Sequence, residues 1–140
     1  MRIEKDLKLD FKDVLIRPKR SEAKSRKDVV LERTYTFRNG NIWTGVPVVA
    51  ANMDGVGTFE MSAVLKKHGL ITCLVKSYEP GDWVENRSSW TAGTTMISTG
   101  ISPSDLEKTQ KVLDDFENIN FVCMDVANGY SEYFVDCVRK

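Results

Sequence analysis

Hydrophobic residues fall into two kinds of run that alternate from Val46 onward. Short, unbroken apolar runs of the kind that form buried strands are each followed by a segment whose apolar positions have helical spacing. This alternation predicts a parallel sheet covered by helices. The four expected strands lie in "VPVVAANMD", "LITCLVK", "TTMISTG" and "INFVCMDVANG".

Cap residues mark the ends of the expected helices. Thr58 is placed as the N-cap of the first helix, and Gly69 follows its last turn. In the third helix, Pro103 suits the first turn, and Ser104 precedes Glu107 by the spacing of a capping box. The second helix, in "PGDWVENRSSW", looks short, weak and polar.

The first 45 residues follow a different pattern. Alternating apolar residues in "DLKLDFKDVLIRPKR" lead into a basic stretch, which ends near Lys27 and is followed by "TYTFRNGNIWTG". Asn39 and Gly40 supply the two positive-φ positions of a type I′ turn, which predicts a β-hairpin. The basic stretch suits a solvated loop, or a phosphate-binding segment because the arginine fork matches phosphate oxygens.

The strand–helix units are about 25 residues long, which suits either a (β/α)8 barrel or an open doubly wound sheet. No GxGxxG or GxxxxGK[ST] motif follows any strand, which weakens the open nucleotide-binding sheet. Four units are about half of a barrel, which typically takes about 250 residues.

Composition narrows the class of protein. The charges of the 20 basic and 20 acidic residues cancel, so no overall electrostatic field favours binding to nucleic acid or to a membrane surface. The N-terminus has no apolar h-region, so we expect no signal peptide, and the apolar runs are far shorter than the roughly 20 residues of a membrane helix. The 3 cysteines form no CxxC pair and indicate reduced thiols in the cytoplasm. No residues have metal-ligand spacing, and His68, the single histidine, suits a helix end.

Polar residues stand at the expected carboxyl ends of all four strands, where both architectures place their sites. Asp125 is the most informative, because it directly follows Val122-Cys123-Met124 and its carboxylate needs a polar partner. Each of the other polar residues at the strand ends can also be explained as a turn residue, a helix cap or a solvated side chain. The set comprises Asn52, Asp54, Lys76, Ser98, Thr99, Asp125 and Asn128.

Several of these segments resemble one enzyme family. The runs "LKLDFKDVLIRPKRS", "KSR", "VPVVAANMDGVGTFEM", "STG" and "FVCMDVANGYSEYFV" closely resemble the GMP reductase family, relatives of IMP dehydrogenase. The resemblance runs from about Leu7 to Val138. It implies an α/β fold: the N-terminal half of a (β/α)8 TIM barrel preceded by a β-hairpin extension. Residues 1–45 would form the extension, and residues 46–140 the first four β/α units of an incomplete barrel domain.

The resemblance also implies an activity: NADPH-dependent reductive deamination of GMP to IMP and ammonia, by an enzyme that is generally a homotetramer. A cysteine of that family attacks the purine before hydride transfer. Only residues 83–94 separate the second helix from the third strand, which leaves no room for the inserted domain usual in IMP dehydrogenases. By motif, the cofactor-contacting residues are Ser25, Arg26, Lys76, Asp125, Val126 and Ala127.

The chain also departs from the family. It reads Val75-Lys76-Ser77-Tyr78 where the family has His-Lys-His-Tyr, and Tyr133 replaces a histidine. The Gly-Pro-Gly-Ser-x-Cys-Thr-Thr loop that carries the family's nucleophile does not occur, so we expect a half-barrel without catalytic residues that is inactive alone. Two alternatives remain: a non-catalytic half-barrel that binds cofactor or pairs with a full-length reductase, and a signalling domain with Asp54 as phosphoacceptor.

Overall fold

The computed structural model describes residues 3–139 and divides into two compact units, Met1–Val30 and Leu31–Lys140. The first unit contains two single-turn 3-10 helices, η1 (Phe11–Asp13) and η2 (Arg26–Asp28). Its apolar side chains are exposed, Phe11 to 93%. The hairpin lies in the second unit, and the boundary expected after residue 45 stays a prediction.

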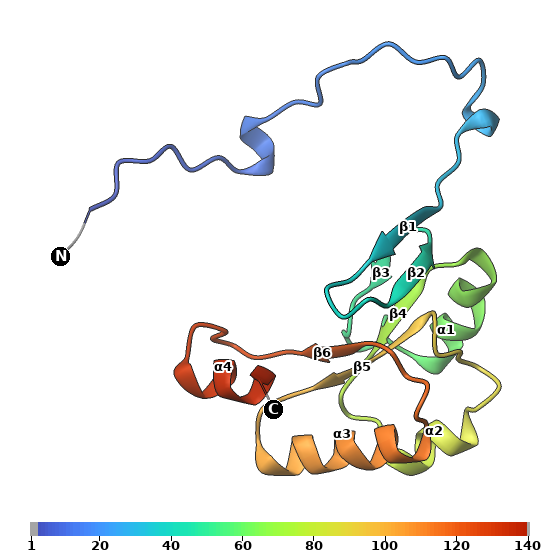
Figure 1. The fold of residues 1–140 in the computed structure, drawn as a ribbon, viewed down its shortest axis with the longest axis vertical. Coiled ribbons are helices and arrows are strands. Elements are labelled where there is room, and N and C mark those ends of the chain that lie inside the picture. The colour runs from blue at the N-terminus through green and yellow to red at the C-terminus, as the bar shows by residue number, and fades with distance from the viewer. Residues whose placement is uncertain (1–2, 140) are drawn as a thin grey trace. The chain divides into compact units, whose positions relative to one another are not determined.

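The second unit is built on a parallel sheet of 4 strands with helices between them, as the alternating pattern predicts (Figure 1). The strands are β3 (Val49–Ala50), β4 (Ile71–Leu74), β5 (Thr95–Thr99) and β6 (Val122–Met124). The helices are α1 (Phe59–Leu65) with its 3-10 extension η3 (Lys66–His68), α2 (Pro80–Glu85), α3 (Pro103–Asp115) and α4 (Glu132–Arg139).

The strand order distinguishes the two architectures that the sequence left open. The strands are hydrogen-bonded in the order β3-β4-β5-β6, which is their order along the chain. A doubly wound sheet reverses its strand order at a switch point, whereas a (β/α)8 barrel adds each strand beside the previous one. The fold is therefore the α/β half-barrel that was predicted, and the signalling-domain alternative loses its structural basis.

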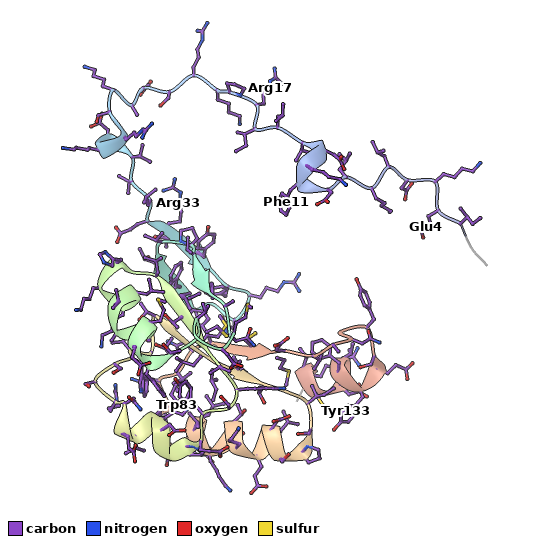
Figure 2. All side chains as sticks on the ribbon, turned by 180° about the vertical axis from the view of Figure 1, so that it is seen from behind. Glu4, Phe11, Arg17, Arg33, Trp83 and Tyr133 are labelled. Carbon is purple, nitrogen blue, oxygen red and sulfur yellow. The ribbon has the colours of Figure 1, made fainter. Side chains whose placement is uncertain are left out.

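One face of the sheet is buried under the helices, and we call it the outer face. Leu74 and Ile97 on this face are 0% and 5% exposed. Figure 2 places Trp83 among the crowded side chains between the helices and the sheet. The sequence suggested that α2 was a weak, polar helix, but Trp83 and the following Trp90 are both buried. Aromatic rings in contact run through this core in the order Tyr78, Phe59, Trp83, Trp90 and Phe116.

A hairpin of β1 (Arg33–Thr36) and β2 (Ile42–Gly45) covers the amino ends of the strands. The indole of Trp43 donates a 2.7 Å hydrogen bond to the carbonyl of Gly93, just before β5. The predicted hairpin is confirmed, but the type I′ turn is wrong. Of the two expected turn residues, Asn39 and Gly40, only Gly40 has a positive φ (84°), and its N–H donates to the carbonyl of Phe37 at 2.9 Å. The connection is a type I turn closed by a left-handed glycine, which is a three-residue loop.

The helix caps agree with the sequence at α1 and differ at α3. Thr58 accepts a 3.1 Å bond from the N–H of Met61, and Gly69 takes a left-handed conformation at the end of η3, as predicted. The capping box predicted at Ser104 is wrong, because Ser102 is the N-cap of α3 and accepts from the N–H of Asp105 at 3.1 Å. Pro103 explains the difference, since proline favours the first helical position and thereby makes the residue before it the cap.

The core contains a hydroxyl that costs stability. Thr72 is fully buried, and its hydroxyl has no hydrogen-bond partner among the residues that the structure describes. We expect Thr72→Val to raise the free energy of unfolding by about 1 kcal/mol, because valine fills the same space without burying a polar group. Urea unfolding followed by fluorescence measures the change.

Thr95→Val is the matched control. Thr95 is equally buried, but its hydroxyl is 3.2 Å from the buried hydroxyl of Ser62. The change leaves the hydroxyl of Ser62 without this partner, so we expect the free energy of unfolding to fall by about 1–2 kcal/mol. Equal effects of the two substitutions would contradict this account.

Candidate functional site

The carboxyl ends of the first and last parallel strands are connected by side chains. Asn52, shortly after β3, donates a 2.8 Å hydrogen bond from Nδ2 to Oδ2 of Asp125, directly after β6. Three strand spacings in a flat sheet would separate these ends by about 14 Å, beyond the reach of two such short side chains. Curvature of the sheet and the loop after β3 together close this distance, and curvature of this kind is what a barrel requires.

Asp125 is held by its backbone, and its carboxylate remains accessible. The N–H of Asp125 donates to the carbonyl of Thr99 at 2.8 Å, so the residue continues the β5–β6 ladder. The side chain is exposed, and among the described residues only Asn52 donates a hydrogen bond to it. Val126 is half-buried and Ala127 exposed in the loop that follows. One carboxylate oxygen is thus free to accept a hydrogen bond from a ligand.

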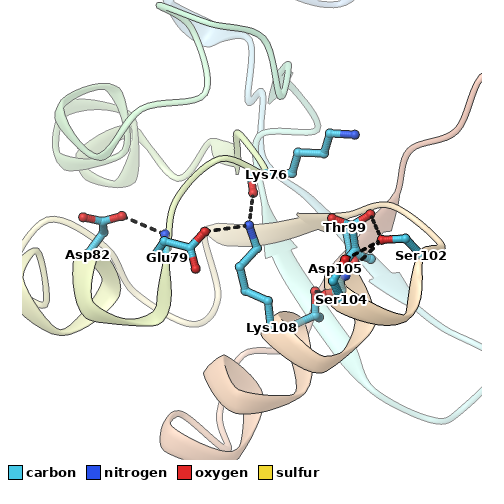
Figure 3. A network of polar contacts seen from close by, with 9 residues as sticks. Lys76, Glu79, Asp82, Thr99, Ser102, Ser104, Asp105 and Lys108 are labelled. Carbon is cyan, nitrogen blue, oxygen red and sulfur yellow. Dashed lines mark hydrogen bonds and ion pairs between the residues drawn. The ribbon is translucent and has the colours of Figure 1, made fainter.

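Lys76 lies at the end of β4, in the loop that leads to α2 (Figure 3). The N–H of Val75 donates to the carbonyl of Gly57 at 2.9 Å, which fixes the start of this loop. The backbone carbonyl of Lys76 accepts a 2.7 Å bond from Nζ of Lys108 on α3. The ammonium group of Lys76 is exposed and extends away from Lys108 in Figure 3. A cation is therefore available at the same edge of the sheet as Asp125.

Ser25 and Arg26, the remaining predicted contacts, belong to the N-terminal unit. The hydroxyl of Ser25 accepts from the N–H of Lys27 at 3.3 Å and caps η2. The backbone N–H of Ser25 donates to the carboxylate of Asp28 at 2.8 Å. Arg26 is exposed in the first turn of η2. Within this unit, the local fold gives Ser25 a capping role and leaves the guanidinium of Arg26 in solvent.

Two thiols face each other on the inner face of the sheet, opposite the helices. Strand register places Cys73 beside Met96, and Cys123 beside Ser98, so all four point to one face. Burial raises the pKa of Cys73 to about 12, and the charge of Cys123, a hydrogen bond with its thiol and the charge of Asp125 add to the effect. A thiol with a raised pKa is a poor nucleophile, because the thiolate is the reactive form.

Other polar residues at the strand ends have structural partners. Ser98 donates to the carbonyl of Leu74, and Thr99 donates to the carbonyl of Gly100 at 3.1 Å. Asn128 accepts from the N–H of Tyr130 at 3.0 Å, which is turn chemistry. Asp54 is exposed in a loop. The positions of Ser98, Thr99 and Asn128 are therefore explained by these bonds without a ligand.

Tyr133, which replaces a histidine of the resembled family, connects α4 to the loop after β5. Its hydroxyl donates to the carbonyl of Ile101 at 3.1 Å. The charge of Cys137 and a hydrogen bond with its thiol raise the pKa of Tyr133.

No group of three or more His, Cys, Asp or Glu side chains within residues 3–139 is placed to hold a metal ion. Across the same residues, no helix has the length and apolar character needed to cross a bilayer.

The sequence marks Asn52 as a polar residue at a strand end, but no motif assigns it to the site. No sequence pattern predicts a role for Lys108, since a lysine on a helix is usually solvated. The signal that could have found it is its position in the first half of α3, the helix that follows β5.

Comparison with known proteins gives consistent results. The IMP dehydrogenase / GMP reductase domain family matches residues 8–140. A GMP reductase from Escherichia coli O81 (strain ED1a) is 54% identical over 144 residues, which cover 100% of this chain and 42% of that protein. A GMP reductase from Klebsiella pneumoniae is also 54% identical over the same share of each chain. The chain thus spans less than half the length of these relatives.

Structural comparison agrees with the sequence matches. The crystal structure of inosine 5′ monophosphate dehydrogenase from Legionella pneumophila superposes with a TM-score of 0.73. It is 26% identical to this chain and covers 92% of it, while the chain covers 38% of that protein.

The environment of Cys73 leads to a testable prediction. With the pKa of Cys73 raised from 9.0 to about 12, its thiolate population near pH 8 falls by about a thousandfold. We expect Cys73 to resist iodoacetamide in the folded protein and to react readily in urea. Peptide mapping by mass spectrometry reports the modification of each cysteine separately. Alkylation of folded Cys73 at the rate of an unfolded thiol would contradict the assignment.

The same shift has a consequence for stability. The unfolded chain releases the Cys73 proton near pH 9.0, whereas the folded chain retains it until about pH 12. Stability contributed by this group is therefore complete below pH 9 and is lost as the pH rises between these two values.

Proposed function

The chain belongs to the IMP dehydrogenase / GMP reductase family, and we propose that it forms the cofactor-binding part of an NADPH-dependent GMP reductase. The reaction is reductive deamination of GMP to IMP and ammonia. The 54% identity to proteins named GMP reductase favours the reductase over the dehydrogenase. The connection between α2 and β5 is also too short for an inserted domain, since α2 ends at Glu85 and β5 begins at Thr95.

The observation that carries the proposal is the accessible carboxylate of Asp125 beside Asn52, at the carboxyl edge that also carries the exposed ammonium of Lys76. A carboxylate, an amide and an ammonium group at one edge suit the binding of a dinucleotide. A carboxylate accepts hydrogen bonds from ribose hydroxyls, and an ammonium binds phosphate or carboxamide oxygens. Val126 and Ala127 would add backbone and apolar contacts in the loop after β6. When bound, NADPH supplies the hydride.

Ser25 and Arg26 are cofactor contacts that the resemblance to the family implies, and they lie in the N-terminal unit. The guanidinium of Arg26 is exposed, and its fork geometry matches the oxygens of a phosphate group. An arginine near the ribose 2′-phosphate is the physical basis for preferring NADPH to NADH.

None of the cysteines in this chain suits the role of nucleophile. Cys73 is 3% exposed with a raised pKa, and Cys137 is buried in α4. Cys123 is half-buried and points toward Cys73 on the inner face. A nucleophile needs an accessible thiolate in an electropositive environment. The proposal is therefore that the 140-residue chain contributes to cofactor binding and is inactive toward GMP when alone.

Fluorescence titration of the chain with NADPH, and separately with NADH, tests the cofactor site. We expect NADPH to bind more tightly. Asp125→Asn should weaken binding about tenfold, because it replaces a charged acceptor of ribose hydroxyls. Asp54→Asn is the matched control, since Asp54 is also an exposed acidic residue after a strand, and it should leave binding unchanged.

Two results would contradict the proposal. One is that NADPH does not bind, or binds no better to the unmodified chain than to Asp125→Asn. The other is steady oxidation of NADPH that depends on GMP, which would place a working nucleophile within these residues.

A second candidate function is supported by the edges of the sheet. Val122 is 46% exposed, although it lies beside the buried Ile97 in register. Within residues 3–139, neither β3 nor β6 has a second neighbouring strand. Unpaired edges favour association, so a half-barrel that pairs with another reductase subunit remains an alternative. Light scattering that detected only monomer, with and without a full-length reductase, would argue against it.

A further inference from the structure

Lys108 bridges two elements of the half-barrel that meet near the end of β4. It lies in α3, but its Nζ atom donates to the backbone carbonyl of Lys76 at 2.7 Å and to Oε1 of Glu79 at 3.2 Å (Figure 3). Both acceptors belong to the connection from β4 to α2, the β4–α2 loop (residues 75–79). The side chain of Lys108 is only 23% exposed, whereas that of Lys111, one turn later, is 62% exposed.

The β4–α2 loop has further contacts at its two ends and one backbone bond within it, from the N–H of Tyr78 to the carbonyl of Val75 at 3.4 Å. At the start, the N–H of Val75 bonds to the carbonyl of Gly57. Toward the end, the ring of Tyr78 packs against Phe59 with centroids 4.4 Å apart, and the N–H of Glu79 donates to Asp82 at 2.7 Å. Lys76 lies between these anchors, inside the turn closed by Tyr78, and its own carbonyl accepts the bond from Lys108.

We infer that Lys108 is a positioning residue that fixes the β4–α2 loop and thereby aims the side chain of Lys76 at the carboxyl edge of the sheet. A charge-assisted hydrogen bond to a carbonyl fixes the peptide plane more strongly than a neutral one. With the Lys76 carbonyl held toward α3, its side chain extends away from Lys108, as Figure 3 shows. The consequence for the cofactor rests on the proposed function, whereas the effect on the loop does not.

Three variants separate this role from general stability. Lys108→Met removes the charge and the donors but keeps an apolar stem of similar length, and Lys108→Arg keeps the charge and several donors. Lys111→Met is the matched control, because it removes a lysine from the same helix whose 3.0 Å ion pair with Glu107 is on the surface. Urea midpoints of all variants report whether the global fold has changed.

Hydrogen exchange followed residue by residue by NMR measures the loop without any cofactor. In Lys108→Met we expect the amides of Tyr78 and Glu79 to exchange about tenfold faster, since the loop opens locally more often. Exchange should return toward the original rate in Lys108→Arg and stay unchanged in Lys111→Met. Unaltered exchange in Lys108→Met would overturn the inference.

Titration with NADPH tests the consequence for the cofactor. We expect Lys108→Met to weaken binding about fivefold and Lys111→Met to leave it unchanged. Faster exchange with unaltered NADPH affinity would overturn the aiming of Lys76. If the unmodified chain fails to bind NADPH, the proposed cofactor site is overturned, while exchange still decides whether Lys108 fixes the loop.

Discussion

Burial of the outer face of the sheet under α1, α2 and α3 is the constraint on which the other features depend. Consecutive parallel strands need helical crossovers, and each crossover returns the chain to the same end of the sheet. All strands therefore finish at one edge, where Asn52, Lys76 and Asp125 are found. Aromatic side chains contribute much of this burial, because a Trp or Phe removes a large apolar area from water. Trp83 and Trp90 are 2% and 1% exposed.

This packing also places polar residues where they can act on the site indirectly. The contact between α2 and α3 brings Lys108 to the β4–α2 loop, and the curvature of the sheet brings Asn52 to Asp125. Both interactions join segments far apart in sequence, and neither belongs to a helix or a strand ladder. The edge that carries the candidate site is thus shaped by side chains rooted in the helical layer and in the first loop, as well as by the strands.

The sequence predicted the features that depend on local chemistry. Apolar runs identified all four parallel strands, and Thr58 and Gly69 marked the ends of the first helical segment correctly. The wrong predictions also concern local structure. Pro103 places the N-cap of α3 at Ser102, and in the hairpin turn Gly40 has a positive φ whereas Asn39 does not. The buried role of Trp83 and Trp90 was missed, because helical spacing is hard to recognise in a six-residue helix. Pairs such as Asn52–Asp125 depend on sheet curvature, which no sequence spacing encodes.

The exposed fractions of two neighbouring residues show where the helical cover of the half-barrel ends. Ile97 on β5 and Val122 on β6 are in register and point to the same outer face, yet they are 5% and 46% exposed. Strands of a parallel sheet are normally covered on both faces, so Val122 marks the point where helical cover ends. The helices bury the outer face of β5 at Ile97, whereas they leave the outer face of β6 partly open at Val122. At the carboxyl end of β4, the Lys76 carbonyl is bound by Lys108 of the helical layer, whereas the Asp125 carboxylate after β6 is bound by Asn52 of the loop after β3. The position of the Lys76 backbone thus depends on the helical layer, and the position of the Asp125 carboxylate depends on the bond from Asn52.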